Sequence, residues 1–486
     1  MSYIKKSTFF NYLNCPTLGW LSKHKKIKEK TGLKEKLLFF EWRDIHNRAY
    51  ELFPDAINAQ INSPAASAQN TNELLQNPNN KTITCAYFTA SNFIARVDVV
   101  KRCENSNELD LIEIKLGKIS KLKYIKEMAY ISMVLLKSGM NINTVSMMLL
   151  NTGYKFGVDV SQMFSSFNCT RKVEEKTLEY ILIADKVEAA IESENMPSPK
   201  FNKTCNKCFF FSTCFGTKYQ NLIFDLPKLS PIVIDELIEK NIFSIEEIPD
   251  DIELTKMQQI VKTCVQNNSV YISPTLKDEI DAIKPPYYYL DFESINTAIP
   301  LYPNVPSRSQ IINQYSIHKS LTIDGPVQHF EYIATGEKDD QYQIAKNLVD
   351  VLGQEGSIMT YAPFEKIVIE RFTLQFPNLK NELLSIVARI VDLEKIIREN
   401  YYDIRFHGRS SIKTLLPILT KDTTYNNLEI SKGGDAAAFF TFMAMGIYDA
   451  TKSRKIKEYL LKYCAQDTMA LLELHQFLFN VVNHKK

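Results

Sequence analysis

The segment from Tyr287 to Glu293 places the strongest constraint on how this chain folds. Its first four residues, Tyr-Tyr-Tyr-Leu, are apolar and aromatic as in a buried strand, and two acids follow at Asp291 and Glu293. Residues two apart lie on one face of a strand, so the two carboxylates stand side by side. Because ionised carboxylates at the end of a buried strand are costly unless a cation compensates them, the segment predicts a metal site. The alternative is an edge strand with two solvated acids.

Hydrolysis of a phosphodiester with two metal ions needs further carboxylates close to this pair. Glu365 follows another expected strand and lies near the start of a helix. Tyr463 and Asp467 are four residues apart on a helical pattern, so they share a face, and a tyrosine placed there can orient the attacking water. Each has an ordinary interpretation too. Glu365 would be a first-turn acid that complements the helix dipole, and Tyr463 a half-buried helix residue.

The order Asp-x-Glu, aromatic-acid and Tyr-x-x-x-Asp over residues 285–486 resembles the tyrosine subclass of the DEDD exonucleases, in the RNase H-like superfamily. The resemblance implies a 3′-to-5′ exonuclease in which the carboxylates bind Mg²⁺ or Mn²⁺. The residues that it assigns to metal binding or catalysis are Asp291, Glu293, Glu365, Tyr463 and Asp467. Glu365 departs from the family pattern, which has aspartate there. Asp392, at another possible strand end, is expected to be a supporting or substrate-facing acid.

A second group of charged residues lies on two neighbouring strands that alternation of apolar residues predicts. Asp98 lies on the first strand, and Glu113 and Lys115 share one face of the second. A Glu-x-Lys pair alone is common on surface strands, but with Asp98 it resembles the PD-(D/E)xK nucleases. The resemblance implies that Asp98 and Glu113 bind Mg²⁺ or Mn²⁺ and that Lys115 helps to activate water. It also implies a metal-binding histidine at His46, on an N-terminal helix.

Four of the nine cysteines have a spacing typical of a metal or cluster site. Cys15 stands alone, and Cys205, Cys208 and Cys214 form a Cys-x₂-Cys-x₅-Cys run. Four thiolates suit either tetrahedral zinc or a [4Fe-4S] cluster. The split spacing resembles RecB-type nuclease domains with an iron-sulfur cluster, including the Cas four family of CRISPR adaptation nucleases. On that resemblance an iron-sulfur cluster is favoured over zinc.

The chain has 486 residues, which exceeds one ordinary domain and predicts two or three. The expected fold class is α/β, with a RecB-like PD-(D/E)xK nuclease domain at 1–220, a helical linker at 221–284 and an RNase H-like domain at 285–486. The linker resembles a helix-hairpin-helix, and a plain helical bundle is an equally good interpretation. Residues 61–80 are rich in Asn, Ala, Ser and Gln, which predicts a polar loop, with a short helix as the alternative.

Charge and apolar patterning constrain the partners less sharply. The net charge is +2, whereas binding to nucleic acid depends on local basic surface. Arg409 and Lys413 lie in a loop that enters a helix, and they are expected to bind phosphates there; capping of that helix by a serine is the alternative. No apolar run approaches the roughly 20 residues of a membrane span, and the first residues lack a signal-peptide pattern. A cytoplasmic protein without a membrane contact is therefore expected.

As a whole, the sequence resembles a bacterial family, labelled as a domain of unknown function, that joins a RecB-like region to a DEDD-type region. Four stretches carry this match: residues 96–99, 224–227, 290–293 and 411–417. The leading hypothesis is a metal-dependent nuclease acting on DNA or RNA, with a second RecB-like nuclease or DNA-binding domain. The alternative is a non-catalytic nucleic-acid-binding scaffold in a repair or defence complex. It is supported by Glu365 and by Lys126, which stands where the RecB-like group has glutamine.

Overall fold

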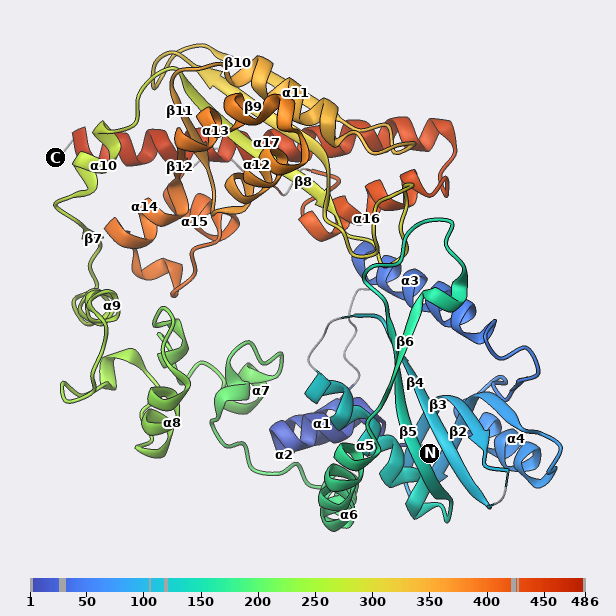
Figure 1. Cartoon of the computed structure of the whole chain (residues 1–486). Coiled ribbons are helices and arrows are strands. Elements are labelled where there is room, and N and C mark those ends of the chain that lie inside the picture. The colour runs from blue at the N-terminus through green and yellow to red at the C-terminus, as the bar shows by residue number, and fades with distance from the viewer. Residues whose placement is uncertain are drawn as a thin grey trace. The chain divides into compact units, whose positions relative to one another are not determined.

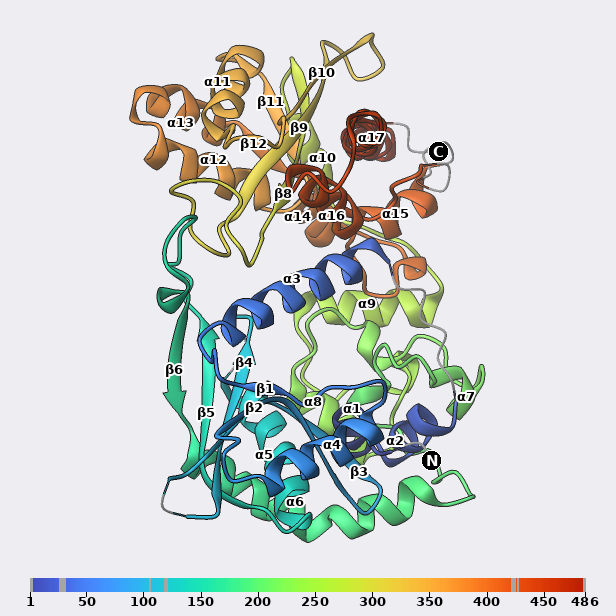
Figure 2. The same cartoon turned by 90° about the vertical axis from the view of Figure 1, so that its right-hand side faces the viewer.

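The computed structural model describes residues 3–25, 32–104, 106–117, 121–420, 425 and 428–483. Over these residues the chain is a mixed α/β structure that divides into two compact units (Figures 1 and 2). Unit 1 comprises residues 1–31, 38–216 and 297–309, and unit 2 comprises residues 32–37, 217–296 and 310–486. Each unit contains its own principal sheet and its own hydrophobic core.

Unit 1 is built on a six-stranded mixed sheet whose strands are adjacent in chain order. The strands are β1 (Ile57–Asn58), β2 (Thr82–Ala90), β3 (Phe93–Arg102), β4 (Glu108–Lys115), β5 (Asn141–Leu150) and β6 (Phe164–Asn168). β2, β3 and β4 form an antiparallel meander, and β5 runs parallel to β4. A parallel neighbour needs a crossover connection, and helix α5 (Lys121–Lys137) supplies it.

Helices cover both faces of this sheet, because alternate strand residues point to opposite sides. On one face, Val100 packs in a cluster with residues of α1 (Lys6–Asn14), α5 and α6 (Thr170–Glu192). On the other face, Val99 packs against Ile45 of α3 (Leu33–Tyr50). The other helical elements of unit 1 are α2 (Pro16–His24), α4 (Pro64–Gln76), α7 (Phe211–Phe215) and the 3₁₀ turns η1 (Val160–Gln162) and η2 (Lys203–Cys205).

Most of residues 61–80, expected as a polar loop, form helix α4. Ser63 caps this helix by accepting a hydrogen bond from Ala66 N (3.2 Å), and Pro64 takes the first helical position. Thr71 is buried and accepts a hydrogen bond from Tyr87 N of β2 (3.0 Å). Capping and packing on the sheet therefore decide the helix, whereas its polar composition alone favours a loop.

Unit 2 is built on a five-stranded sheet with the order β10-β9-β8-β11-β12. The strands are β8 (Tyr287–Ile295), β9 (Ile311–Ser320), β10 (Val327–Ile333), β11 (Ser357–Thr360) and β12 (Ile390–Asp392). β9 is antiparallel to β8 and β10, whereas β11 runs parallel to both β8 and β12. The expected strand at 287–292 is thus the central strand, which excludes the alternative of an edge strand with solvated acids.

Helices also cover both faces of this second sheet (Figure 2). Leu290 of β8 packs with buried residues of α11 (Gln341–Leu352), α12 (Phe364–Gln375) and α13 (Lys380–Ala388). Tyr289 points the other way, toward α17 (Ala450–Asn483), where its hydroxyl is hydrogen-bonded to His475 Nδ1 (3.0 Å). By the same alternation, Asp291 and Glu293 are directed toward α17.

The remaining elements of unit 2 are short. The helices are α8 (Pro231–Glu239), α9 (Lys256–Asn267), α10 (Leu276–Asp281), α14 (Leu393–Asn400), α15 (Ile412–Leu419) and α16 (Gly433–Ala444). The 3₁₀ turns are η3 (Ile223–Asp225), η4 (Ile245–Glu247), η5 (Pro377–Leu379) and η6 (Ile404–Phe406), and β7 (Tyr271–Ile272) pairs with β13 (Tyr401–Tyr402). The helical segment expected at 221–284 is therefore part of unit 2.

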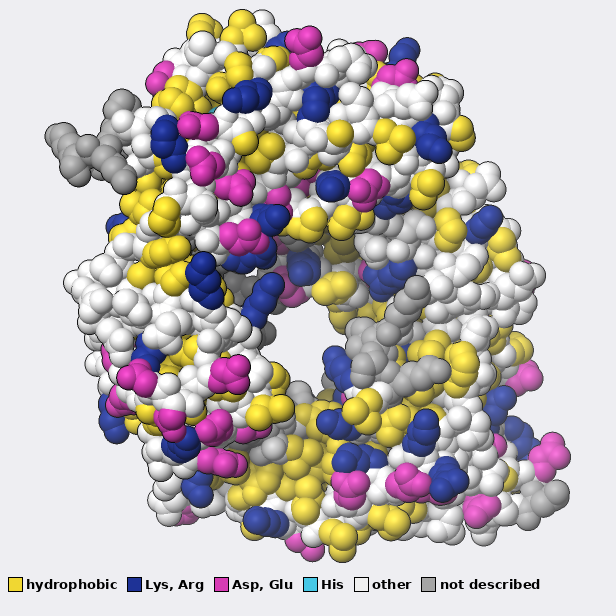
Figure 3. Space-filling model, turned by 60° about the vertical axis from the view of Figure 1, so that its left-hand side comes forward, with side chains coloured by type: hydrophobic (Ala, Val, Ile, Leu, Met, Phe, Trp, Pro, Cys, Tyr) yellow, Lys and Arg dark blue, Asp and Glu magenta, His cyan; other side chains and the backbone are white. Residues whose placement is uncertain are grey.

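Two surface properties bear on the expected partners. Among the described helices, none has the length and apolar character needed to cross a membrane. On the face shown in Figure 3, basic and acidic side chains are interspersed, in keeping with the net charge of +2. A contact with an anionic partner therefore has to be sought at particular sites rather than in the overall charge.

Candidate functional site

The two acids at the end of β8 face helix α17. The residues that flank Asp291, Leu290 and Phe292, pack in the cluster on the opposite face of the sheet. The Asp291 carboxylate accepts a hydrogen bond from the Cys464 thiol of α17 (Sγ to Oδ2, 3.5 Å). Glu293 lies two residues further along the strand, on the same side as Asp291. Strand alternation thus brings both acids to the part of α17 that carries Asp467.

Asp291, Glu293 and Asp467 form a compact acidic group. Ligand oxygen atoms of the three residues lie within 4.8 Å of one another. Burial raises the pKa of Asp291 well above its usual range, and the charges of Asp467, Glu365 and Glu293 raise it further. Burial and the charge of Asp467 likewise raise the pKa of Glu293 to about 8. Carboxylates this close cannot all be ionised without a compensating cation, so the group has the chemistry of a divalent metal site.

Glu365, the expected second-motif acid, is not one of these three, but its charge raises the pKa of Asp291. It stands in the first turn of α12 and is 2% exposed. Burial raises its pKa to about 8, with further contributions from the charges of Asp392 and Asp467. Among the described residues, its Oε2 atom has no hydrogen-bond partner. A buried carboxylate oxygen without a partner is costly, and a cation held with Asp291 would provide one.

Asp392 supports the turn that precedes Glu365. It caps α14 by accepting a hydrogen bond at Oδ1 from Lys395 N (3.2 Å). The same oxygen accepts a hydrogen bond from Ala362 N (3.0 Å), and Ala362 has a positive φ of 71°. Because a positive φ is unfavourable for alanine, this contact helps to hold the turn. The contacts of Asp392 fit the interpretation of a supporting acid rather than a substrate-facing one.

Tyr463 is joined by two residues from other segments. Lys413, in the first turn of α15, donates a hydrogen bond to Tyr463 Oη, and its ammonium lies 4.4 Å from the Tyr463 ring centroid. Tyr425 donates a hydrogen bond to Asp467 Oδ1 (2.6 Å). Burial raises the pKa of Asp467, while the charge of Lys413 and hydrogen bonds from Tyr425 and Tyr463 lower it. Sequence reasoning missed Tyr425, which lies in a polar stretch without periodicity.

The two basic residues expected to bind phosphates are placed differently. Lys413 lies at the acidic group, whereas Arg409 is exposed, and its charge lowers the pKa of Asp225, which burial raises. The preceding residue, Gly408, has a φ of +67°, and a Cβ there would lie 1.9 Å from the Asp225 carbonyl oxygen. Asp225, in one of the family-like stretches, thus packs against a position where only glycine fits. Within the described residues, Ser411 makes no side-chain capping bond to α15.

The PD-(D/E)xK-like residues of unit 1 come together on α3, β3 and β4. His46 Nε2 lies 3.4 Å from Asp98 Oδ2. Glu113 Oε1 accepts a hydrogen bond from Asp98 N (3.1 Å), and Lys115 Nζ donates to Glu113 Oε2 (2.8 Å). All four residues are buried. The residues that the sequence analysis singles out are therefore neighbours in the structure.

Fixed cations already pair with the acids of this second group. Arg96 Nη2 lies 2.6 Å from Asp98 Oδ1, and Ile114 N donates a hydrogen bond to Asp98 Oδ2 (2.9 Å). Burial opposes ionisation of Asp98, but the hydrogen bond from His46 and the charge of Arg96 hold its pKa well below its usual range. Sequence reasoning missed Arg96, although its position two residues before Asp98 places it on the same strand face.

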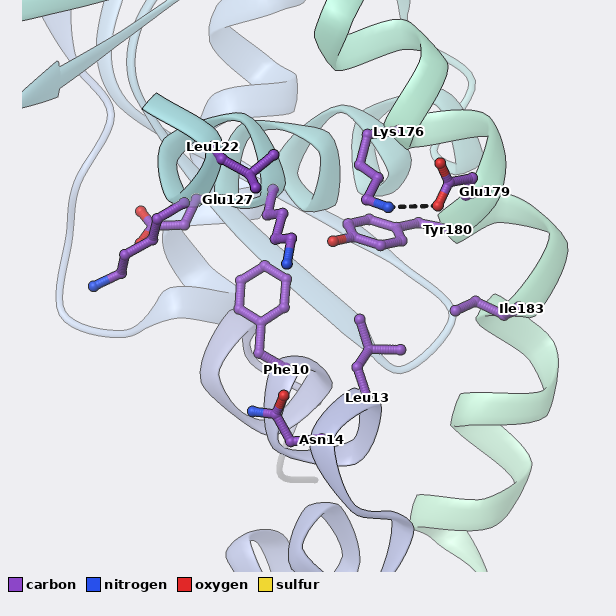
Figure 4. Close-up of a pocket in the computed structure, with 11 residues that line it drawn as sticks. Phe10, Leu13, Asn14, Leu122, Glu127, Lys176, Glu179, Tyr180 and Ile183 are labelled. Atoms are coloured by element: carbon purple, nitrogen blue, oxygen red, sulfur yellow. Dashed lines mark hydrogen bonds and ion pairs between the residues drawn. The ribbon is translucent and has the colours of Figure 1, made fainter. Parts of the chain in front are cut away.

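Glu127 of α5 extends this network to a pocket of unit 1. Its Oε2 atom lies 3.2 Å from Lys115 Nζ and 3.0 Å from Lys6 Nζ. The pocket, of about 560 Å³, is lined by residues of α1, α5 and α6, including Lys126 and the labelled Phe10 (Figure 4). The sequence analysis did not single out Glu127, because a helix acid has no partner until the helix is packed on the sheet.

The four cysteines with cluster-like spacing line one small cavity of unit 1, together with apolar residues of α2 and α7: Cys15, Cys205, Cys208, Cys214, Leu18, Leu21, Phe210, Phe211 and Phe215. Backbone contacts bring the two parts of the chain together. Thr204 Oγ1 donates to Asn14 O (3.3 Å), and Trp20 Nε1 donates to Ser193 O (2.8 Å). Burial raises the pKa of the Cys205 thiol, and the other three cysteines add to the shift. The distant Cys15 thus joins the clustered three.

Comparison with known proteins identifies similar sequences, but none of them has a known activity. A family model described as a domain of unknown function, DUF2779, matches residues 288–411, which contain Asp291, Glu293, Glu365 and Asp392. The chain is also 25% identical over 230 residues to the uncharacterized protein MG366 of Mycoplasma genitalium. That alignment covers 43% of this chain and 34% of the relative. Part of the acidic group therefore lies in a stretch that other proteins share.

The raised pKa values of Glu293 and Glu365 predict that the metal-free folded protein loses stability as the pH rises and that a bound metal ion restores this stability. Their usual value is 4.5 and their value in the folded protein is about 8, so in this window the metal-free folded state binds more protons than the unfolded chain. Stability is then lost as the pH rises from 4.5 toward about 8, and Mn²⁺ should restore it. The melting temperature of the parent and of the double variant Glu293→Gln, Glu365→Gln, measured across this range with EDTA or Mn²⁺, tests this.

The test compares how the melting temperature of the parent and that of the double variant depend on pH. Burial lowers the pKa of His318 and of His475 to about 4, which acts in the opposite sense but equally in both proteins. Glu370→Gln, an exposed acid on the same helix as Glu365, serves as the control. Equal pH slopes in the parent and the double variant would contradict the prediction.

Proposed function

We propose that residues 285–486, most of which belong to unit 2, form an RNase H-like 3′-to-5′ exonuclease domain that acts on DNA or RNA with Mg²⁺ or Mn²⁺. The observation that carries the proposal is the acidic group: ligand oxygens of Asp291, Glu293 and Asp467 lie within 4.8 Å of one another, and the charge of Glu365 also raises the pKa of Asp291. The sheet order supports the assignment. Its first strand is central and carries the acids, with an antiparallel pair on one side and two parallel strands on the other.

We assign the residues of the group different roles in phosphodiester hydrolysis. The four carboxylates would hold the divalent ions, which supply Lewis acidity to the phosphate and the attacking water when bound. Asp291 is fixed by the pairing of β8 with β9, opposite Ser316, so a sheet rather than a loop sets its position. Tyr463, one helical turn before Asp467 on α17, would orient the water. Among the described residues Glu365 Oε2 has no hydrogen-bond partner, which supports its assignment as a metal ligand.

For residues 1–220, most of which belong to unit 1, we propose a RecB-like domain that binds DNA rather than cleaving it. Asp98 and Glu113 are each within hydrogen-bond distance of a fixed cation, Arg96 and Lys115 respectively. This pairing balances the charge of the two acids without a metal, unlike the group in unit 2. Lys126, which replaces the glutamine of the RecB-like nucleases, supports the same choice.

An iron-sulfur cluster fits the four cysteines of unit 1 better than zinc does. Zinc–sulfur bonds of about 2.3 Å in a tetrahedron place sulfur atoms about 3.8 Å apart. Among the described residues, no three of the four sulfur atoms lie within 4.8 Å of one another, which supports the wider sulfur spacing of a cluster. Thiolates alone, without histidine, are the usual ligands of a [4Fe-4S] cluster. Cys15, Cys205, Cys208 and Cys214 would therefore hold the cluster and join the first helices to the end of unit 1.

Replacement of Asp291 by alanine is expected to reduce Mn²⁺-dependent trimming of 3′ ends by about 100-fold or more, because the shared site loses its central ligand. The measurement is the rate of shortening of 5′-labelled single-stranded and duplex DNA and RNA. Asp278→Ala removes an exposed acid of α10 in the same unit and serves as the control. Trimming by Asp291→Ala at the parental rate would refute the assignment. Salt-sensitive binding without turnover by the parent would favour the scaffold alternative.

Glu113→Ala provides the corresponding test of unit 1. Because Glu113 is already paired with Lys115, its removal is expected to leave the trimming rate of the full chain unchanged. The same labelled substrates measure this. Loss of trimming in Glu113→Ala would instead mean that the two sites act together in cleavage.

The cluster assignment predicts a brown protein after anaerobic purification, with about four iron and four sulfide ions per chain. Cys208→Ser should lose most of both, because it removes one of four thiolate ligands. Cys103, which is half-buried and does not line the cavity, provides a matched control as Cys103→Ser. A colourless parent that contains one zinc ion per chain would refute the cluster.

A further inference from the structure

A lysine is held firmly at the edge of the acidic group in unit 2. Lys413 Nζ donates hydrogen bonds to Tyr463 Oη and to Ser431 O (3.3 Å). The same ammonium lies 4.4 Å from the ring centroid of Tyr463 and 4.6 Å from that of Tyr425. Contacts from three separate parts of the chain thus hold it, and a cation between aromatic faces is favourable.

Lys413 is not an ordinary counter-ion of the acids. Its charge lowers the pKa of both Glu293 and Asp467. Nevertheless, among the described residues no carboxylate oxygen lies within 4.0 Å of its ammonium. Lys115 of unit 1 differs, because it contacts Glu113 directly at 2.8 Å. In unit 2 the phenol of Tyr463 is the direct partner of the lysine, and the acids lie beyond it.

This contact decides how the Tyr463 hydroxyl group is oriented. A phenol has one hydrogen to donate, and its oxygen can accept. Because Lys413 donates to Tyr463 Oη, the phenolic hydrogen must point away from the lysine. Asp467 lies one helical turn further along α17, on the same face of the helix as Tyr463. The hydroxyl hydrogen is therefore directed toward the acids, where the divalent ions and the attacking water would be held.

We propose that Lys413 is a positioning residue of the exonuclease and that it acts through Tyr463. It fixes the direction of the Tyr463 O–H bond, so that the phenol meets the attacking water with its hydrogen. A charged donor also polarises the phenol and strengthens the hydrogen bond that the phenol gives. The proposal rests on the proposed function of unit 2, and it assigns Lys413 to the turnover step rather than to binding of the phosphate backbone.

A double-mutant cycle tests whether the two residues act as a unit. Lys413→Met keeps the apolar stem over the two rings but removes the charge and the donor. It is expected to lower kcat by about 10- to 100-fold with little change in KM, as a misplaced catalytic group does. In a Tyr463→Phe background, which already lacks the hydroxyl group, Lys413→Met should change kcat by less than about twofold. Lys413→Arg, which retains a charged donor, should recover part of the lost rate.

Two controls separate positioning from folding and from phosphate binding. Lys452 also lies over a tyrosine ring of unit 2, 4.1 Å from the centroid of Tyr448, so Lys452→Met removes a comparable contact away from Tyr463. It should leave kcat unchanged, and thermal melting should show that all variants are folded. The dependence of KM on salt should be the same in Lys413→Met and the parent, because loss of a phosphate contact would reduce that dependence.

The outcomes distinguish this proposal from the proposed function. If the parent trims and Asp291→Ala does not, the exonuclease assignment stands. Three results would then refute Lys413 as a positioning residue. The first is that the effects of Lys413→Met and Tyr463→Phe on kcat multiply in the double variant. The others are that Lys413→Met raises KM instead of lowering kcat, or that its kcat and KM equal those of the parent. If the parent trims no substrate, the proposed function fails and the role of Lys413 fails with it.

Discussion

Asp291 and Glu293 of the central strand meet Asp467 of α17, and Glu365 adds its charge. The repulsion among these four carboxylates is the constraint on which the rest of unit 2 depends. Burial and neighbouring charges raise the pKa of Asp291 and Glu293, and Glu365 has an oxygen without a hydrogen-bond partner among the described residues. Such a group is costly unless a cation shares it. The aromatic start of β8, the α17 contacts and the turn held by Asp392 all keep the acids together against this cost.

The two units compensate the negative charge of their acids in different ways. In unit 1 each acid has a cation of its own, Arg96 for Asp98 and Lys115 for Glu113, at ordinary ion-pair distances. In unit 2 the ammonium of Lys413 contacts the hydroxyl group of Tyr463 instead of a carboxylate, so the carboxylate oxygens remain available to a metal ion. Because only the second arrangement needs an external cation, we infer that metal-dependent chemistry belongs to unit 2 and binding to unit 1. The match of residues 288–411 to a domain of unknown function covers the strand and helix that carry the first three acids.

Much of the secondary structure could be predicted from local pattern. The strand from Tyr287, the helix that carries Tyr463 and the meander that carries Asp98 and Glu113 agree with periodicity and turn residues. Helix α4 could not be predicted in the same way, because capping by Ser63 and packing of Thr71 on β2 outweigh its polar composition. Tyr425 and Glu127 were also missed. Neither lies in a motif, and each gains its role only from a partner more than ten residues away.

The sequence by itself determined which residues are candidates for the chemistry: the acids at the end of β8, the tyrosine and aspartate one helical turn apart, and the four cysteines of unequal spacing. These depend on periods of 2 and 3.6 residues and on ligand type, which are local properties. Only the tertiary structure decided how the charges are compensated. Arg96 pairs with Asp98, and Lys413 reaches Tyr463 from another helix. Electrostatic balance depends on distances between residues far apart in the chain, and no local pattern contains those distances.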